Sequence, residues 1–203
     1  DTPVSRRPRM RDDAAWRAYA AKLDAFGAHL KARYGITLAY HHHMGAYVES
    51  PDDIDRLMSL TDPAKVGLLF DTGHAYFGGA QDPVALLRRH LSRVVHVHCK
   101  DVRTPVIAQA RNDGWSFLNG VINGTFTVPG DGSVDYPAVL APIARAKYHG
   151  WLVVEAEQDP AVVVRGREGD EPHGRGVVGA VLEAEVAAAA AATGGVVRHD
   201  AER

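Results

Sequence analysis

The feature that most constrains the fold is a repeated alternation of short apolar segments with helical ones. Four segments are largely apolar, and the stretches between them carry apolar residues at the 3.6-residue spacing of a helix. Ser50–Pro51 and Asp82–Pro83 have the capping residue and first-turn proline that begin a helix. Continuous apolar strands that alternate with helices indicate a parallel α/β sheet buried on both faces. The expected strands are 35–40, 66–71, 93–101 and 151–159, and the expected helices are 14–33, 50–60, 82–91 and 134–150.

Composition and charge place the chain among ordinary soluble proteins. Its 203 residues are 46% hydrophobic and 24% charged, and the formal net charge of -2 gives no reason to expect binding to nucleic acid or to an anionic membrane. No apolar run approaches the roughly 20 residues that span a bilayer. The single cysteine, Cys99, allows no intrachain disulfide and fits a reducing compartment. We therefore expect a cytoplasmic protein with no nucleic-acid or membrane partner.

Each expected strand runs into ionisable residues at its C-terminal end. The first is followed by three histidines, the second ends in Asp71, the third carries His98 and the fourth carries Glu155. In parallel α/β folds the carboxyl ends of the strands form one edge, and the ligand site lies there. The sequence therefore predicts that four ionisable sets meet at one edge of the sheet, and this convergence is the main functional signal.

The three consecutive histidines cannot all face the same way. Side chains alternate along a strand, so His41 and His43 share one face while His42 lies on the other. We expect His41 and His43 to point into the site and His42 to pack among the helices.

The donors at this edge are imidazoles and carboxylates rather than thiolates. Such a mixed set suits a divalent metal such as Mn²⁺, Co²⁺ or Zn²⁺ with positions left open for a substrate. Cys99 is expected to be a small buried residue, because a thiolate site would need further cysteines. His74 follows Asp71 by three residues and can reach the same point if a turn folds it back over the strand end.

Further polar residues stand just beyond the last two strands. Glu157 shares a strand face with Glu155, and Lys100 and Asp101 follow the third strand. Lys100 and Asp101 either bind polar groups of a substrate or pair with each other.

The remaining segments are less regular. The long loop before residue 134 contains Pro-Gly and Asp-Gly turns, and its Trp115 and Phe117 either close the site as a lid or pack on its rim. Residues 163–203 are rich in glycine, alanine and charge, and we expect them to be weakly ordered. The organised domain is expected to span residues 1–162.

Five collinear motifs stand out in the chain: LAYHHHMG, LLFDTGHAYFGG, RVVHVHCKDVR, FTVPGDG and GWLVVEAEQDP. In order and spacing they resemble the inosose dehydratases, which belong to the xylose-isomerase-like sugar isomerase and epimerase barrels. The resemblance covers roughly residues 1–162. It implies a (β/α)₈ barrel and a divalent metal, Mn²⁺ or Co²⁺, and brings glutathione into consideration as a further cofactor.

The resemblance also implies a reaction. That reaction is the dehydration of 2-keto-myo-inositol (scyllo-inosose) to a trihydroxycyclohexane-1,2-dione in inositol catabolism. The protein would then be a hydro-lyase whose partner is a small cyclic polyol ketone.

Roles for individual residues follow from the same resemblance. In the wider superfamily one metal ligand comes from each of four successive strand ends, and His43 competes with His41 for the first of these positions. By this pattern the metal ligands are His41, Asp71, His98 and Glu155. The residues implied for proton transfer are His43, His74 and Glu157, and those implied for substrate binding are Lys100, Asp101, Arg103 and Gln158.

The number of strands keeps further interpretations open. A full (β/α)₈ barrel needs about 250 residues, so we expect a partial barrel, the C-terminal four βα units, with two unpaired parallel edges. A ketose isomerase or epimerase of the same superfamily would share the metal and the barrel. A catalytically inert, truncated fragment and a homo-oligomer of half barrels are also compatible with this strand count.

Overall fold

The central element of the fold is a sheet of four parallel strands. The computed structural model describes residues 2–80 and 82–157, and the strand order in its larger sheet is β1, β2, β3, β6. All three pairings are parallel, as the sequence predicts. The strands are β1 (Leu38–His41), β2 (Val66–Asp71), β3 (Val94–Cys99) and β6 (Trp151–Val154).

Helices connect these strands and begin at the residues that the sequence indicates. The side chains of Asp12, Ser50 and Asp82 each cap a helix by accepting a backbone N–H three residues further on. The helix expected at 134–150 is capped by Asp135 but already ends at Arg145. The helices are α1 (Asp13–Tyr34), α2 (Pro51–Leu60), α3 (Thr72–Phe77), α4 (Pro83–His90), α5 (Thr104–Asn112), α6 (Phe117–Ile122) and α7 (Tyr136–Arg145), with short 3₁₀ turns η1 (Val4–Arg6) and η2 (Leu91–Arg93).

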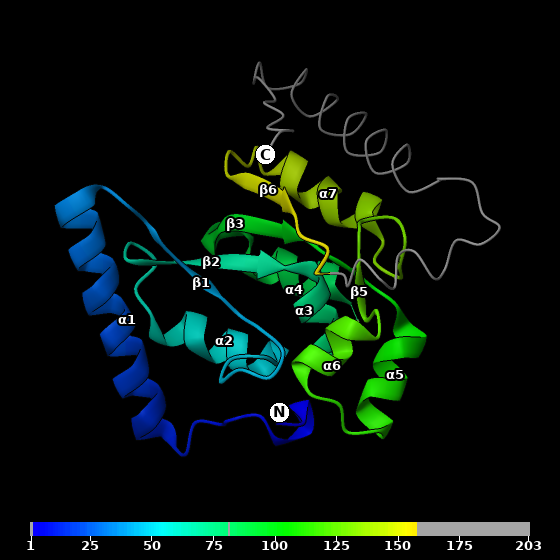
Figure 1. The fold of residues 1–203 in the computed structure, drawn as a ribbon. Coiled ribbons are helices and arrows are strands. Elements are labelled where there is room, and N and C mark those ends of the chain that lie inside the picture. Colours follow the sequence, from blue (N-terminus) through cyan, green and yellow to red (C-terminus); the bar gives the residue numbers. More distant parts are fainter. Residues whose placement is uncertain (1, 81, 158–203) are drawn as a thin grey trace.

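The segment between β3 and α7 is folded rather than a long loop, which corrects the expectation from sequence. It contains α5, α6 and an antiparallel pair of short strands, β4 (Asp101–Val102) and β5 (Phe126–Thr127). These elements are too short to give a clear periodic pattern in the sequence. We call this segment between β3 and α7 the insertion. Figure 1 shows it beyond the arrowheads of β2 and β3, next to the carboxyl edge of the sheet.

The pairing of β2 with β3 contains one irregularity. The register shifts between Leu68 and Leu69, so that Val95 is an extra residue in β3. From there on the pairing is regular, and it sets Asp71 opposite His98.

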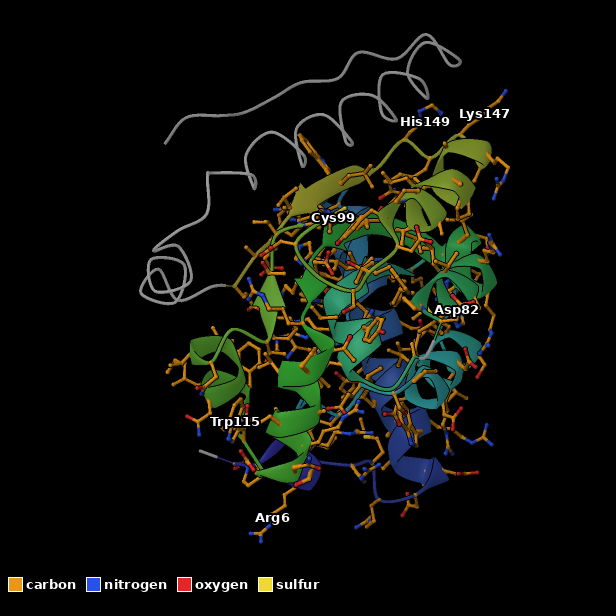
Figure 2. The ribbon with its side chains drawn as sticks, turned by 90° about the vertical axis from the view of Figure 1, so that its right-hand side faces the viewer. Arg6, Asp82, Cys99, Trp115, Lys147 and His149 are labelled. Atoms are coloured by element: carbon orange, nitrogen blue, oxygen red, sulfur yellow. The ribbon has the colours of Figure 1, made fainter. Side chains whose placement is uncertain are left out.

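Burial differs between the centre and the edges of the sheet. Almost every residue of β2 is buried, whereas Trp151 and Val154 of β6 are exposed. The expected burial on both faces therefore holds for β2 and is wrong for β6, which within the described part of the chain pairs with β3 alone. Cys99 is fully buried, and Figure 2 shows it in the interior while Lys147 and His149 project outward. Burial raises the pKa of Cys99 to about 12. The tail expected at 163–203 lies outside the described residues.

Candidate active site

The four residues predicted as metal ligands meet at the carboxyl edge of the sheet. Asp71 Oδ2 lies 3.5 Å from His41 Nε2 and 3.5 Å from His98 Nδ1. Glu155, just past the end of β6, forms an ion pair with His98 Nδ1. The donor atoms of His41, Asp71 and His98 lie within 4.8 Å of one another. We call His41, Asp71, His98 and Glu155 the ligand cluster.

The ligand cluster contains buried polar atoms that face one another as ion pairs but make no hydrogen bond. Within the described residues, the atoms without a hydrogen-bond partner include His41 Nε2, Asp71 Oδ2, His98 Nδ1 and Glu155 Oε2. Buried polar atoms are normally paired, so this concentration of exceptions needs an explanation. Two imidazole nitrogens and two carboxylate oxygens are donors that Mn²⁺, Co²⁺ and Zn²⁺ accept. The residues present therefore fit a divalent metal.

Asp71 uses its two carboxylate oxygens differently. Oδ1 caps α3 by accepting the backbone N–H of His74 at 2.8 Å, while Oδ2 faces the ligand cluster. Burial alone would raise the pKa of Asp71, but the surrounding imidazoles and the Lys100 ammonium hold it well below its usual value. The contact with Asp71 in turn raises the pKa of His98. Asp71 is therefore an anion at neutral pH and attracts cations to the cluster.

Lys100 stands between the ligand cluster and a second set of residues. Its side chain is fully buried, donates a hydrogen bond to Glu157 and lies with Nζ 3.1 Å from His74 Nε2. The same ammonium is 3.5 Å from Asp71 Oδ2 and 3.4 Å from Glu155 Oε2. The structure thus brings Lys100, for which the sequence predicts substrate binding, into the centre of the site.

The residues predicted for proton transfer form that second set. Donor atoms of His43, His74 and Glu157 lie within 4.8 Å of one another, and the two imidazole rings are 3.7 Å apart between centroids. Burial lowers the pKa of His43, and it lowers the pKa of His74 well below the usual value. Both imidazoles are therefore neutral at neutral pH. We call His43, His74 and Glu157 the proton-transfer group.

Two phenylalanines from the insertion form an aromatic wall beside this group. Phe117 of α6 lies 4.7 Å from His43, and Phe126 of β5 lies 5.1 Å from His74, measured between ring centroids. The sequence identifies Phe117 only as part of a lid or rim, and it gives no signal for Phe126. Both depend on how the insertion folds back over the strand ends, which local patterns do not encode.

His42 faces away from the site, as the alternation along the strand predicts. It is fully buried, its ring packs against Phe70, and its Nε2 accepts the backbone N–H of Asp71 at 3.2 Å. Burial lowers the pKa of His42 to about 3, so this ring is neutral at neutral pH. Its role here is to support the end of β2 from behind.

Asp101 is predicted from the sequence to bind substrate, and in the structure its carboxylate contacts the insertion. Its buried carboxylate accepts the backbone N–H groups of Val102 at 2.8 Å and of Gly130 and Val134 at 2.9 Å. Both oxygens are thereby used to hold the loop between β5 and α7. This loop folds back onto β4 and covers the carboxylate, and a substrate-binding role for Asp101 stays a prediction.

Arg103 likewise contacts residues of the insertion. Its guanidinium donates to the carbonyl of Gly124 at 2.9 Å, to Thr127 Oγ1 at 3.0 Å and to Asp131 Oδ2 at 2.7 Å. These contacts hold the segment between β3 and α7 together, and a substrate-binding role for Arg103 stays a prediction. Gln158, predicted for the same role, lies outside the described residues.

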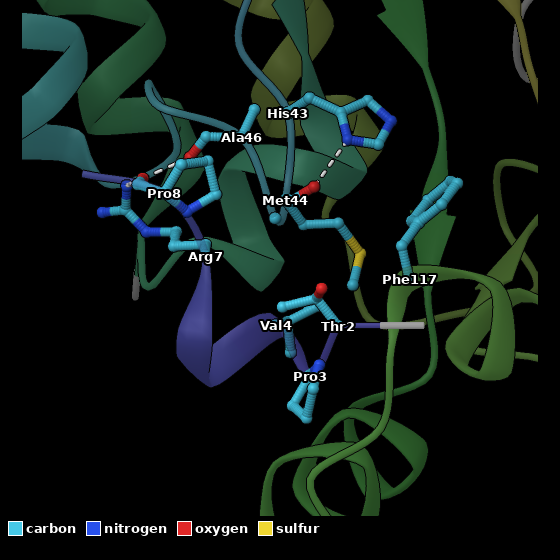
Figure 3. A pocket seen from close by; sticks show the side chains of 10 residues that line it. Thr2, Pro3, Val4, Arg7, Pro8, His43, Met44, Ala46 and Phe117 are labelled. Carbon is cyan, nitrogen blue, oxygen red and sulfur yellow. Dashed lines mark hydrogen bonds between the residues drawn. The ribbon is translucent and has the colours of Figure 1, made fainter. Parts of the chain in front are cut away.

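A cavity of about 390 Å³ opens beside the proton-transfer group. Figure 3 shows His43, Met44 and Phe117 on one side of it, with Val4 of the N-terminal segment on another. The buried guanidinium of Arg7 fixes the loop after β1 by donating to two of its carbonyls, each at 3.1 Å. The cavity thus adjoins His43 but not the ligand cluster.

Comparison with known proteins identifies the fold family. The family model described as the xylose isomerase-like TIM barrel matches residues 2–176. The chain belongs to this family. Its four parallel strands are accordingly part of such a barrel, in agreement with the expected partial (β/α)₈ fold.

Curated relatives of this chain include a rhizopine catabolism protein and several inosose dehydratases. The rhizopine catabolism protein of Rhizobium meliloti is 54% identical over 158 residues, which cover 78% of this chain and 47% of that protein. The inosose dehydratase of Halalkalibacterium halodurans is 47% identical over 75% of this chain and 50% of its own length. That of Clostridium beijerinckii is 43% identical over 80% and 54%. The chain therefore spans about half the length of the curated relatives it matches.

Solved structures with the same barrel fold are more distant in sequence. The probable 3-DHS dehydratase from Bacillus anthracis superimposes with a TM-score of 0.59 at 14% identity, over 79% of this chain and 56% of that one. An L-ribulose 3-epimerase gives 0.57 at 16% identity, over 96% and 61%. At these identities the likeness concerns the fold alone. Among the described residues of this barrel chain, no helix has the length and apolar character to cross a membrane.

Proposed function

We propose that the protein containing this chain is a metal-dependent hydro-lyase that converts scyllo-inosose into a trihydroxycyclohexane-1,2-dione. The observation that carries the proposal is the pairing of two sites at one sheet edge. One is the ligand cluster with its unsatisfied donor atoms, and the other is the proton-transfer group beside it. The two inosose dehydratases at 43% and 47% identity support this substrate.

The reaction removes the proton next to the ketone and expels a hydroxyl from the following carbon as water. A divalent metal, Mn²⁺ or Co²⁺, held by His41, Asp71, His98 and Glu155 would supply Lewis-acid polarisation of the carbonyl. The remaining requirements are a base for the carbon-bound proton and an acid for the departing hydroxyl. Both are tasks for the chain's own residues.

His43 is best placed to take the proton. Its Nδ1 lies 2.7 Å from the carbonyl oxygen of Met44, so Nδ1 carries the ring proton and donates it. Nε2 then keeps its lone pair, and the lowered pKa keeps the ring neutral. His43 also lines the cavity, whereas His74 has Nε2 directed to Lys100.

Lys100, which contacts the other two members of the proton-transfer group, supplies hydrogen-bond donors. Lys100 is an ammonium without solvent exposure that is shared between Glu157 and His74. Such a donor stabilises an oxygen that gains negative charge and can pass it a proton. The proton that His43 takes from carbon would then return to Lys100 by way of His74 and Glu157. Glu157 is also the competing candidate for the base.

Two other functions use the same residues. A ketose epimerase begins with the same proton removal, and the fold is shared with an L-ribulose 3-epimerase. A role in rhizopine catabolism is favoured by the 54% identity to the Rhizobium meliloti protein, which exceeds the identity to the two dehydratases reported above. A catalytically inert fragment is the third possibility.

Turnover by the full-length protein decides between these functions. Incubation with scyllo-inosose and Mn²⁺ should produce the absorbance of the dione, and His43→Gln should abolish turnover while Mn²⁺ still binds. Interconversion of ketohexoses without dione formation would instead establish an epimerase. For an inert fragment, a thermal melt of the chain is decisive, because an assembled site should melt cooperatively and at a higher temperature with Mn²⁺.

A further inference from the structure

Lys100 is fixed from its backbone to its ammonium by the residues that follow β2. Thr72 Oγ1 accepts the backbone N–H of Lys100 at 3.0 Å and donates to its carbonyl oxygen at 2.7 Å. Gly73 leaves space for the aliphatic part, since a Cβ there would come within 2.7 Å of Lys100 Cγ. The ammonium lies 5.1 Å from the ring centroid of Phe126. Lys100 is therefore a built-in part of the site rather than a mobile side chain at its rim.

The atoms around the ammonium are of the kind that bind a metal ion. Nζ faces His74 Nε2 and carboxylate oxygens of Asp71, Glu155 and Glu157, all within 3.5 Å. His74 Nδ1 accepts the backbone N–H of Met44 at 3.4 Å, so a neutral ring carries its proton on Nε2, and a metal ion bound at Nε2 would displace that proton. An imidazole nitrogen with several carboxylate oxygens is a common donor set for divalent metals.

Two cation positions therefore lie side by side at this sheet edge. The first is the ligand cluster, and the second is the point where His74 and Glu157 contact Lys100, with His43 beside those two residues. Asp71 Oδ2 belongs to both, because it is 3.5 Å from His98 Nδ1 and 3.5 Å from Lys100 Nζ. Such an arrangement has the form of a dinuclear site in which one metal ion is replaced by an amino group.

We propose that Lys100 occupies a second metal position and thereby limits the protein to one divalent metal ion. Removal of the ammonium would open a site formed by His43, His74 and Glu157. This inference rests on the proposed function only in taking the ligand cluster as the first metal site. It makes no use of the substrate or the reaction.

Charge balance gives the physical reason. The carboxylates of Asp71, Glu155 and Glu157 carry three negative charges, which one divalent ion and one ammonium neutralise. A second divalent ion beside Lys100 would leave two positive charges in excess at a largely buried site, which is unfavourable. Without Lys100 and with one metal, one negative charge stays unbalanced and attracts another cation. Keeping the second metal out also leaves His43 and His74 free to move protons.

The test counts metal ions bound per chain of the full-length protein. Equilibrium dialysis against Co²⁺ followed by elemental analysis should give one ion for the wild type and two for Lys100→Met. Methionine removes the charge while keeping an unbranched chain of similar length. The visible absorption of Co²⁺ should also change, because the second ion gains imidazole ligands.

Three further variants locate the second ion. The double variant Lys100→Met, His74→Gln should return to one ion, because it lacks a ligand of the opened site. Lys22→Met, which removes an exposed lysine of α1, should stay at one. If circular dichroism shows that Lys100→Met does not fold, Lys100→Gln removes the same charge with a polar side chain and should bind two ions.

Each other result overturns the inference. A folded Lys100→Met or Lys100→Gln that binds a single ion would show that the ammonium does not hold a metal position. A wild type that binds two ions, one of them lost in His74→Gln, would show that Lys100 does not exclude the second metal. A wild type that binds none would overturn the ligand cluster and the proposed function together, whereas the first two results leave the dehydratase proposal intact.

Discussion

Asp71 and Asp101 are both fully buried aspartates near the carboxyl ends of neighbouring strands, yet their carboxylates make different contacts. Asp71 uses Oδ1 to cap α3 and leaves Oδ2 without a hydrogen bond inside the ligand cluster. Asp101 uses both oxygens to accept backbone N–H groups of the insertion. A carboxylate at a strand end is thus not a site residue by position alone. What distinguishes the two is whether an oxygen remains unsatisfied after the hydrogen bonds of the fold are counted.

The electrostatic surroundings of the two carboxyl groups differ in the same way. Asp71 is surrounded by imidazoles and Lys100, which outweigh burial and hold its pKa well below the usual value. Burial raises the pKa of Asp101, because only backbone dipoles oppose it. Charged and imidazole side chains therefore surround Asp71, whereas backbone hydrogen bonds surround Asp101.

The largest expected difference between the two aspartates is in metal affinity. Asp71→Asn should weaken Mn²⁺ or Co²⁺ binding by about 1,000-fold, since loss of a buried charge partner costs about 4 kcal/mol. Asp101→Asn should bind the metal nearly as tightly as the wild type does. Isothermal titration calorimetry of both variants measures this contrast. Equal losses of affinity would mean that Asp101 takes part in the metal site and that the comparison is wrong.

The next expected effect concerns folding stability. Asp101→Ala should lower the free energy of unfolding by about 3 kcal/mol, because it leaves buried N–H groups of the insertion without an acceptor. Urea denaturation measures the change, and Asp113→Ala, at an exposed position of the insertion, serves as the control with a change within about 0.5 kcal/mol. A negligible loss for Asp101→Ala would show that its hydrogen bonds do not hold the loop.

The third prediction concerns His42, which supports the backbone of Asp71 from the side away from the ligand cluster. His42→Gln should lower the free energy of unfolding by about 2 kcal/mol, because it disturbs a buried ring and its hydrogen bond to the backbone of Asp71. Metal affinity should change little, whereas His41→Gln should lose it. If His42→Gln abolished metal binding while His41→Gln kept it, the strand would face the other way and the ligand cluster would be misassigned.

The smallest expected effect is in the pH dependence of stability, measured without metal in the presence of a chelator. The folded-state pKa of Asp71 lies below the unfolded value, so its contribution is present above that value and is lost as the pH falls. The folded-state pKa of Asp101 lies above the unfolded value, so its contribution is greatest at low pH and declines as the pH rises.

Slopes of opposite sign should therefore appear when each asparagine variant is compared with the wild type, below about pH 4 for Asp71 and above about pH 4 for Asp101, because an unfolded aspartate titrates near that value. The stability lost in Asp71→Asn should grow as the pH rises, and the stability lost in Asp101→Asn should shrink. Each slope is at most about 1.4 kcal/mol per pH unit. Urea midpoints across the pH range give both slopes, and slopes of the same sign would contradict the assigned surroundings of one aspartate.

Much of the site could be predicted because it depends on periodicity. Alternation of side chains at the end of β1, continued through the two residues after it, separates His41 and His43 from His42. The parallel arrangement brings Asp71 and His98 together. These inferences need only the strand geometry and the rule that carboxyl ends share an edge.

The parts that the sequence could not predict depend on a segment folding back over the strands. The roles of Asp101 and Arg103 are set by the loop that covers them, and the wall formed by Phe117 and Phe126 comes from short elements of the insertion. The space that holds Lys100 also escapes the sequence, because it appears only once Thr72 and Gly73 begin a helix rather than a turn.

The extra residue Val95 in β3 has a consequence for anyone who exchanges parts between members of the family. In a strand without the bulge, the residue opposite Asp71 would be Val97, whose side chain faces away from the site. A strand taken from another family member to replace β3 must therefore either contain the same extra residue or have one residue fewer before its histidine. The number of residues before the histidine of β3, rather than sequence similarity, is the criterion that a functional chimera of this barrel has to meet.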